Sequence, residues 1–331
     1  MAEFINQIDI SNFKSIRNAK IRNCRRINLF IGRPNVGKSN ILEALALFTV
    51  PYLEYYKSQN LKSLVRCESP GELFYGGNYE TAASVETNLV SVQLILENHD
   101  DLDLKLVYQN NAGMEQYNFN FNDNLQMRQT RKAPGALSHI KKYTFATHFE
   151  DQYLKTSSLL PPYGDNLYRV IELNPDLKKE IQALFREYQL ELTFDRASQS
   201  LKVLKRNKES IFLIPYHSIA DTLQRIIFYK TAIASNKDSV LLFEEPEAHS
   251  FPPYMTQITQ EMIYNRTNQY FVATHSPFIL NDLLENAGGE LSVYLVDYKS
   301  QETKIKHLND KTMHEISQSG VDLFTNWETF A

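Results

Sequence analysis

A phosphate-binding loop signature near the N-terminus constrains the fold of this chain more than any other feature. Residues 32–39 read Gly-Arg-Pro-Asn-Val-Gly-Lys-Ser and fit the pattern G-x-x-x-x-G-K-[ST]. The apolar run 27–31 before it predicts a buried strand, and residues 40–47 after it have the spacing of an amphipathic helix. This strand–loop–helix order is the context that the pattern requires, and it argues against an ordinary glycine turn.

Such a loop binds polyanions because its backbone N–H groups and the helix N-terminus carry partial positive charge. We expect the side chain of Lys38 to reach the β- and γ-phosphates of a nucleotide and the Ser39 hydroxyl to bind Mg²⁺. ATP and Mg²⁺ are therefore the expected cofactors. The expected nucleotide-binding residues are Asn35, Val36, Gly37, Lys38, Ser39 and Asn40.

Composition bounds the class of protein. The chain has 331 residues with 43% apolar and 22% charged side chains, which is typical of globular proteins and favours a main domain with an insertion. The net charge of −4 indicates no global basic field for nucleic acid, although a local patch stays open. Two cysteines are too few for a disulfide framework. Without a signal-peptide pattern or a membrane-length apolar run, we expect a cytoplasmic protein with no membrane partner.

The pattern of apolar residues predicts an α/β fold with an insertion. Residues 4–31 and 84–121 alternate as antiparallel strands do, and from residue 211 onward buried strands alternate with helices. A helix at 175–188 and a strand pair follow the meander. We predict an ATPase core at residues 1–50 and 211–331, with an inserted β-meander and helical subdomain at 51–210.

One polar and basic segment, residues 123–142, has two interpretations. It contains Arg128, Arg131, Lys132, Lys141 and Lys142 around a Pro-Gly pair. We interpret it as a loop in preference to a binding surface.

Two carboxylates follow the apolar run 240–243. Strands of open α/β sheets present ligand-binding residues at their carboxyl ends, so Glu244 and Glu245 are expected at such an edge. Glu244 would hold Mg²⁺, largely through water. Glu245 would polarise the water that attacks the γ-phosphate. The plain alternative is a solvated acidic loop.

A histidine follows a third apolar strand in the segment Val-Ala-Thr-His-Ser-Pro, residues 272–277. His275 is expected to contact the γ-phosphate or the attacking water. A hydrogen-bonded histidine at a strand end is the alternative for an isolated residue. Here the order of loop, Glu-Glu-Pro and Thr-His-Ser-Pro, each after an apolar strand, favours the catalytic interpretation.

This combination resembles the ABC-type ATPases of the SMC/RecF/overcoming-lysogenization-defect group. Residues 8–16 resemble the opening strand and turn of that group, residues 245–249 its Walker B end and D-loop, and His275 its switch histidine. The resemblance is specific at residues 4–49 and 211–282, and it implies a P-loop NTPase with an ABC-type head and an N-terminal antiparallel β portion. Glu244 stands where the group more commonly has aspartate, which keeps the charge and lengthens the reach.

The resemblance also implies that a second subunit completes the site through a signature loop. The best match is residues 216–222, with Ser218 and Asp221 as the expected nucleotide contacts in a head-to-tail homodimer or higher homo-oligomer. No glycine occupies the position where the usual signature has one. The alternative is a helix capped by Asp221 or Ser218, and the two interpretations are compatible.

Two features that the sequence lacks narrow the cellular function expected of this ATPase. Residues 50–210 contain no heptad arms, and about 85 residues follow Pro246, too few for a TOPRIM nuclease domain. We therefore expect a sensor or scaffold that controls a separate effector such as a nuclease or toxin, which the resemblance places in bacterial anti-phage defence. The alternatives are a RecF-like repair or recombination ATPase that binds DNA directly, and a module that binds ATP without hydrolysing it.

Overall fold

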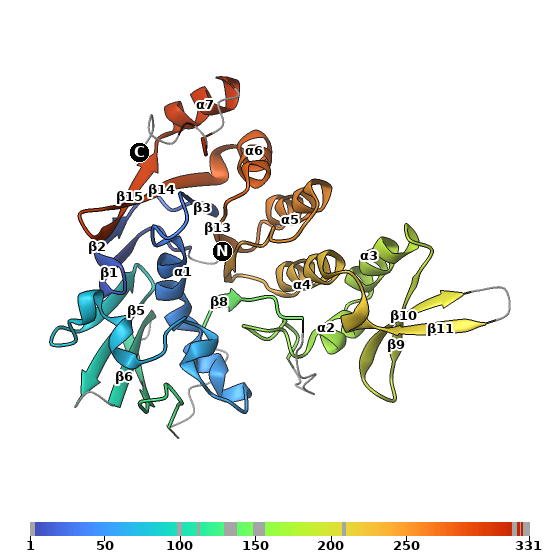
Figure 1. The fold of residues 1–331 in the computed structure, drawn as a ribbon, viewed down its shortest axis with the longest axis horizontal. Helices are drawn as coiled ribbons and strands as arrows, with labels where there is room; N and C mark the ends of the chain where they lie inside the picture. Colours follow the sequence, from blue (N-terminus) through green and yellow to red (C-terminus); the bar gives the residue numbers. More distant parts are fainter. Residues whose placement is uncertain are drawn as a thin grey trace. The chain divides into compact units, whose positions relative to one another are not determined.

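The structure is a computed structural model that describes residues 4–97, 101–110, 113–128, 138–147, 156–206 and 210–319, together with residues 323, 324 and 326. The chain divides into two compact units (Figure 1). The phosphate-loop unit comprises residues 1–142, 238–245 and 266–331, and the helical unit comprises residues 143–237 and 246–265. No helix in the described ranges is long and apolar enough to cross a membrane.

The phosphate-loop unit is built on a six-stranded sheet in the order β15–β14–β3–β13–β12–β8. The parallel strands are β3 (Ile27–Ile31), β12 (Val240–Glu244), β13 (Gln269–Ala273) and β14 (Leu291–Lys299), and β15 (Glu302–Leu308) runs antiparallel to β14. Every residue of β3 and β13 is buried, as expected for parallel strands covered on both faces. The carboxyl ends of β3, β12 and β13 therefore meet at one edge of the sheet.

The edge strand β8 (Ile140–Tyr143) corrects the predicted loop at residues 123–142. Lys141 and Lys142 are 7% and 5% exposed, so these two lysines form no basic surface. Because two of its four residues are lysines, this strand does not show the apolar pattern that predicts a buried strand. Arg131 and Lys132 lie outside the described residues.

Three helices belong to the phosphate-loop unit: α1 (Lys38–Ala46), α6 (Pro277–Asn286) and α7 (Asp310–Ser319). Helix α1 follows the phosphate loop directly and continues into the 3₁₀ segment η1 (Leu47–Tyr55). The Ser276 side chain caps α6 by accepting a hydrogen bond from the Ile279 N–H, and Pro277 occupies the first turn, where a missing N–H costs nothing.

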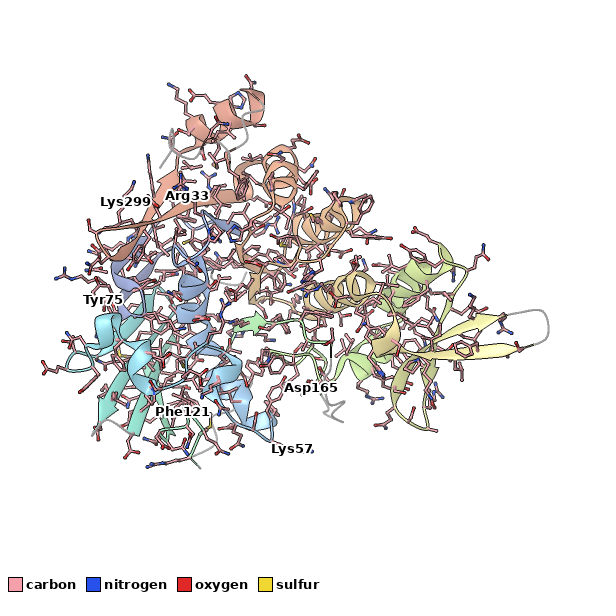
Figure 2. The ribbon with its side chains drawn as sticks, viewed as in Figure 1. Arg33, Lys57, Tyr75, Phe121, Asp165 and Lys299 are labelled. Atoms are coloured by element: carbon pink, nitrogen blue, oxygen red, sulfur yellow. The ribbon has the colours of Figure 1, made fainter. Side chains whose placement is uncertain are left out.

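A second, antiparallel sheet completes this unit in the order β2–β1–β4–β5–β6–β7. Its strands are β1 (Ile8–Phe13), β2 (Ile16–Ile21), β4 (Ala83–Thr87), β5 (Val90–Glu97), β6 (Asp101–Asn110) and β7 (Gly113–Phe121). The predicted antiparallel meander is confirmed. Because β4 pairs with β1, the meander belongs to the same unit as the phosphate loop. Short 3₁₀ segments, η2 (Leu61–Ser63), η3 (Pro70–Leu73) and η4 (Tyr75–Gly77), precede it; Tyr75 and Phe121 are labelled in Figure 2.

The described residues of the helical unit form four α-helices and a three-stranded sheet. The helices are α2 (Leu167–Leu173), α3 (Pro175–Arg186), α4 (Asp221–Ser235) and α5 (Pro252–Tyr264), and the sheet runs β11–β10–β9 with β9 (Glu191–Asp195), β10 (Ser200–Arg206) and β11 (Ile211–Pro215). The predicted helix and strand pair are confirmed. Asn174 caps α3, and Leu177, Ile181 and Phe185 form its buried stripe.

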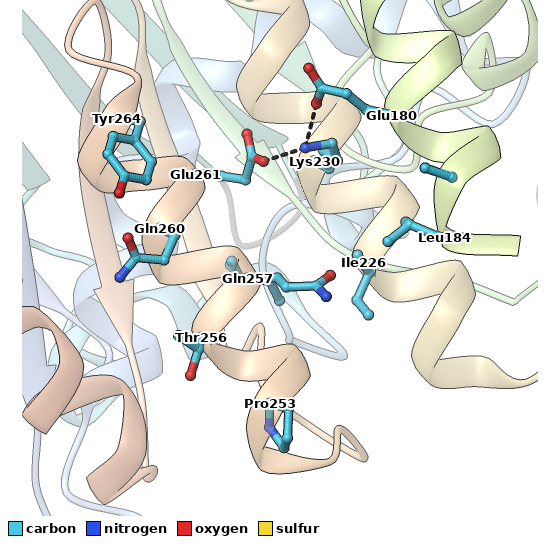
Figure 3. A pocket seen from close by; sticks show the side chains of 12 residues that line it. Glu180, Leu184, Ile226, Lys230, Pro253, Thr256, Gln257, Gln260, Glu261 and Tyr264 are labelled. Carbon is cyan, nitrogen blue, oxygen red and sulfur yellow. Dashed lines mark hydrogen bonds and ion pairs between the residues drawn. The ribbon is translucent and has the colours of Figure 1, made fainter. Parts of the chain in front are cut away.

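A lysine joins three helices of the helical unit. Lys230 on α4 forms ion pairs with Glu180 on α3, at 2.6 Å, and with Glu261 on α5 (Figure 3). Beside this cluster lies a groove of about 410 Å³, whose lining includes Leu184 and Ile226. The ion pairs compensate the burial of the lysine, whose side chain is 13% exposed.

The two units group residues differently from the predicted domain boundaries. Residues 51–142 lie in the phosphate-loop unit, whereas residues 211–237 and 246–265 lie in the helical unit. The predicted core at 1–50 and 211–331 with an insertion at 51–210 stays a prediction.

Candidate nucleotide-binding site

The phosphate loop requires glycine at both ends. Gly37 has φ 101° at the N-cap of α1, and a Cβ there would lie 2.1 Å from Thr303 Oγ1. A Cβ on Gly32 would lie 2.2 Å from the carbonyl oxygen of Val296. Any side chain would therefore displace the strands that flank the loop. Asn35, in the exposed part of the loop, has a left-handed φ of 61°.

Lys38 lies inside this loop. Its side chain is buried, and Nζ donates hydrogen bonds to the carbonyl oxygens of Gly32, at 2.9 Å, and Arg33, at 2.7 Å. Burial lowers the pKa of Lys38 to about 8, although Glu245 and then Glu244 act in the opposite direction. The ammonium group is thus held at the loop by neutral carbonyls, which a phosphate could replace as a partner.

The acidic residues and the histidine follow neighbouring strands. Glu244 ends β12 beside Ala273 of β13, and the Glu245 N–H donates to the Ala273 carbonyl at 2.8 Å. His275 Nε2 lies 3.7 Å from Glu245 Oε1. Burial, and then Lys38, lower the pKa of His275 while Glu245 opposes them, so the imidazole is mainly neutral at pH 7. The structure thus brings Lys38, Glu245 and His275 to one edge of the sheet.

Glu245 itself has a backbone conformation that glutamate rarely adopts. Its φ is 43°, in the left-handed region. Such conformations cost free energy and are concentrated at functional sites. The hydrogen bond from Glu245 N to β13 holds this turn and directs the chain away from the sheet directly after Glu244.

Behind Glu244 lies a network of ionised side chains. Glu43 on α1 is fully buried and accepts hydrogen bonds from Lys14 and from Arg66 Nε, the latter at 2.9 Å. Arg66 also donates to Glu244. Lys142 Nζ lies 3.9 Å from Glu244 Oε2 and donates to the Leu64 carbonyl at 2.8 Å. The predicted metal ligand is therefore paired with two cations in this structure.

Comparison with known proteins decides the family. Residues 4–209 match the family model described as AAA ATPase domain. The chain belongs to this AAA ATPase family. That match and the strand order confirm the predicted α/β P-loop NTPase fold and the predicted membership of a P-loop ATPase family. In the described residues no α-helix is longer than the 15 residues of α4, so that part of this AAA ATPase carries no coiled-coil arm.

Relatives match over short segments. An ATP/GTP phosphatase from Helicobacter pylori is 31% identical over 111 residues, which cover 31% of this chain and 28% of that protein. The uncharacterized protein MJECL10 from Methanocaldococcus jannaschii is 52% identical over 44 residues, or 13% of this chain and 20% of that protein. The matches thus span less than a third of either relative.

Two solved structures are similar over most of the chain. The SMC head bound to the C-winged helix domain of ScpA is 14% identical with a TM-score of 0.49, covering 95% of this chain and 100% of that chain. The SMC head domain from Thermotoga maritima is 13% identical with a TM-score of 0.45, covering 93% and 100%.

The donors at this ATPase site fit a magnesium ion that arrives with its nucleotide. Ser39 is half-buried at the start of α1, and the side chain of Glu244 is 20% exposed. Mg²⁺ needs few protein carboxylates because phosphates and water fill its other positions. In the described residues no group of three or more His, Cys, Asp or Glu side chains could hold a metal. Arg66 competes with a metal for Glu244.

The segment expected to act as a signature loop lies in the helical unit. Ser218 is exposed at the end of η6 (Tyr216–Ser218), and Asp221 is the first residue of α4. Ala220 is the N-cap, and no side chain caps this helix, so the alternative of a helix capped by Asp221 or Ser218 is wrong. The Asp221 carboxylate instead accepts from Arg225 Nε at 2.8 Å. The role of both residues at a nucleotide stays a prediction.

A buried glutamine is hydrogen-bonded to the backbone of that segment. Gln224 is 2% exposed and its amide donates to the carbonyl oxygen of Ile219 at 2.9 Å. The Thr222 hydroxyl donates to the His249 carbonyl, also at 2.9 Å, which ties α4 to the predicted D-loop.

The ion network of Glu43, Arg66 and Lys142 was not predicted from the sequence, and the contact of Asn40 with a nucleotide stays a prediction. The Asn40 amide donates to Ser15 Oγ at 2.6 Å. A charged residue at position 43, among buried Leu42 and Ala44, was the available signal for the ion network. Nothing local marks Arg66 or Lys142, because their partners come from distant strands and helices.

Proposed function

We propose that this chain binds and hydrolyses ATP at the phosphate loop, and that a second copy completes each site. The observation that carries the proposal is the cluster of Lys38, Glu245 and His275 beside Glu244 at the carboxyl edge of the central sheet. Membership of an ATPase family supports ATP as the nucleotide. The Helicobacter relative is an ATP/GTP phosphatase, which supports hydrolysis over the matching segment.

Each residue has a distinct part in the proposed reaction. Lys38 would exchange its loop carbonyls for phosphate oxygens, and Ser39 and Glu244 would hold Mg²⁺, which would supply positive charge to the phosphates. Glu245 orients the attacking water as a general base. His275, mainly neutral at pH 7 and 3.7 Å from Glu245, contacts the γ-phosphate or that water.

A second copy would supply Ser218 and Asp221 in a head-to-tail arrangement. The start of α4 has no side-chain cap, and the N-terminus of a helix carries partial positive charge that attracts an anion. Ser218 is exposed beside this N-terminus. These features suit contact with a γ-phosphate held on the phosphate loop of the other copy.

We further propose that the ATPase acts as a sensor or scaffold for a separate effector protein, such as a nuclease or toxin. Within the ranges that the structure describes, no second acidic or metal-binding cluster accompanies the nucleotide site. The context of bacterial anti-phage defence rests on the family resemblance. Endonuclease activity in the pure protein that survives loss of the nucleotide site would contradict this assignment.

Direct DNA binding loses part of its support. Lys141 and Lys142 are buried, and Arg128 pairs with Asp101 at 2.5 Å. A salt-dependent affinity for duplex DNA in the pure protein would restore this alternative.

The deciding experiment compares wild type with Glu245→Gln, Lys38→Ala and the control Glu285→Gln, an exposed position on α6. We expect Glu245→Gln to lower turnover by about 100-fold or more while an ATP-bound dimer accumulates. Lys38→Ala should abolish nucleotide binding, and Glu285→Gln should behave as wild type. Turnover and mass are measured by phosphate release and light scattering.

Two results would contradict the proposal. A Glu245→Gln variant that holds ATP as a monomer excludes the shared site. A wild-type protein that binds ATP without single-turnover hydrolysis is a binding module.

A further inference from the structure

The hairpin of β14 and β15 delivers one buried hydroxyl to the phosphate loop. Lys299 and Glu302 face each other, so Ser300 and Gln301 form a two-residue turn, and both have left-handed φ values of 55° and 63°. Thr303 is the second residue after this turn and is 1% exposed. Its N–H donates to the Ser15 carbonyl at 2.9 Å, which joins β15 to the turn between β1 and β2.

Four side-chain and backbone groups form one directional hydrogen-bond chain. Thr303 Oγ1 donates its single proton to the Val36 carbonyl at 2.9 Å. The 2.7 Å contact between Ser15 Oγ and Thr303 Oγ1 must therefore take its proton from Ser15. Ser15 Oγ in turn accepts from the Asn40 amide at 2.6 Å. The direction is Asn40 to Ser15 to Thr303 to Val36.

Both ends of this series of hydrogen bonds lie in the candidate nucleotide-binding site. Val36 precedes Gly37 and Lys38, and Asn40 follows Ser39, so the chain spans the residues expected to contact phosphate and metal. The Thr303 side chain also fills the space that glycine leaves at position 37, where a Cβ would lie 3.0 Å from Thr303 Cγ2. Each hydroxyl in the series is both donor and acceptor, so loss of one removes a hydrogen bond from each of its two neighbours.

We propose that Thr303 is a positioning residue of the nucleotide site. Its hydroxyl completes the hydrogen bonds that hold Val36 and Asn40, the residues on either side of Gly37–Ser39. Its side chain also packs against Gly37 and so determines how closely the loop approaches β15. The identity of the ligand as ATP rests on the proposed function, whereas the role of Thr303 in fixing the loop conformation does not. Thr303 acts through Val36 and Ser15 and touches no substrate.

The test uses the full chain with three variants. Thr303→Val keeps the shape and removes the hydroxyl, and Thr303→Ser restores the hydroxyl. Thr87→Val is the matched control, because the Thr87 hydroxyl also donates to a backbone carbonyl, that of Val90 at 2.8 Å, within the same unit. Hydrogen exchange of amides 33–40 is measured without nucleotide, and the dissociation constant of ATP is measured by calorimetry with thermal unfolding in parallel.

We expect Thr303→Val to accelerate exchange in the loop and to raise the dissociation constant about tenfold, which corresponds to about 1.4 kcal/mol. Thr303→Ser should return both values close to wild type. Thr87→Val should leave both unchanged, even where it lowers the unfolding temperature.

The outcomes separate this inference from the proposed function. Exchange in Thr303→Val that equals wild type overturns the inference, whatever ATP does. Faster exchange in Thr303→Val alone, combined with a wild type that does not bind ATP, supports the positioning role and overturns the proposed function. An equal weakening of ATP binding by Thr87→Val reduces the effect to general destabilisation and also overturns the inference.

Discussion

The environment of the Lys38 ammonium group favours a phosphate ligand. Its ammonium group is buried against two loop carbonyls, and these neutral partners do not compensate the desolvation of the charge, which is why its pKa falls to about 8. A phosphate would supply the missing negative charge. The free energy of binding then includes relief of this desolvation.

This residue makes ATP affinity dependent on pH. Below pH 8 the free protein already carries the charge, so the dissociation constant should be nearly flat. Above pH 8 the neutral lysine must take up a proton to bind phosphate, and the dissociation constant should rise by up to about tenfold per pH unit. Calorimetric titrations from pH 7.5 to 9.5 measure it. Lys38→Arg stays charged and should lack the dependence, and a flat wild-type profile would refute the argument.

Some residue roles could be read from the sequence and others could not. Gly37, Lys38 and Glu245 lie in contiguous motifs after apolar strands, so local order was sufficient to place them together. Asn40 shared the motif but its amide is bound to Ser15, which is 25 residues away. The spacing of residues in the motif does not reveal which side chains stabilise the conformation of the loop.

At the scale of elements, strand β8 shows how tertiary contacts override composition. Two lysines in four residues predict a solvated loop, but Lys142 lies near Glu43 and Glu244, and Lys141 lies 5.6 Å from the ring centre of Tyr52. The other strands were predictable because their apolar periodicity agrees with their burial, as in β5. An edge strand that buries cations needs partners from other elements, which pattern analysis does not show.

Glu43 links α1 to those elements, and its loss should destabilise the phosphate-loop unit. Burial alone would raise the pKa of Glu43, but Lys14 and then Lys142 outweigh it and the pKa is lowered. The stabilisation is therefore present above the ordinary carboxyl range and is lost as pH falls through the lower folded value. Glu43→Gln should reduce the free energy of unfolding by about 3 kcal/mol at pH 7, because its cations lose a buried partner.

Urea unfolding of Glu43→Gln, beside the exposed control Glu86→Gln, measures this effect. The difference from wild type should shrink as pH falls below the ordinary carboxyl range, because the wild-type carboxylate becomes protonated as pH approaches its lowered folded pKa. A loss that is equal at pH 7 and pH 3 would show that packing rather than charge is responsible.

For the whole molecule, the shared site predicts complementation between two inactive variants. Lys38→Ala lacks the phosphate loop function, and Ser218→Arg blocks the proposed signature contact. A mixed dimer contains one site in which both contributions are intact. An equimolar mixture should therefore recover about a quarter of wild-type ATP turnover, whereas each variant alone stays inactive.

The measurement is phosphate release after mixing and equilibration without nucleotide. The control is a protein that carries both changes in the same chain. A dimer of this double variant contains no intact site. Activity that remains absent in the mixture would mean that each copy acts alone or that Ser218 faces no nucleotide.

The hydroxyl chain through Thr303 also dictates when the site can exist. Val36 and Thr303 are 267 residues apart, and strand β3, which leads into the loop, is flanked by β13 and β14 from the C-terminal third. Synthesis proceeds at about 5–20 residues per second, so the finished loop leaves the ribosome tens of seconds before its partners. A growing chain therefore carries the motif long before the hydrogen-bonded loop can form.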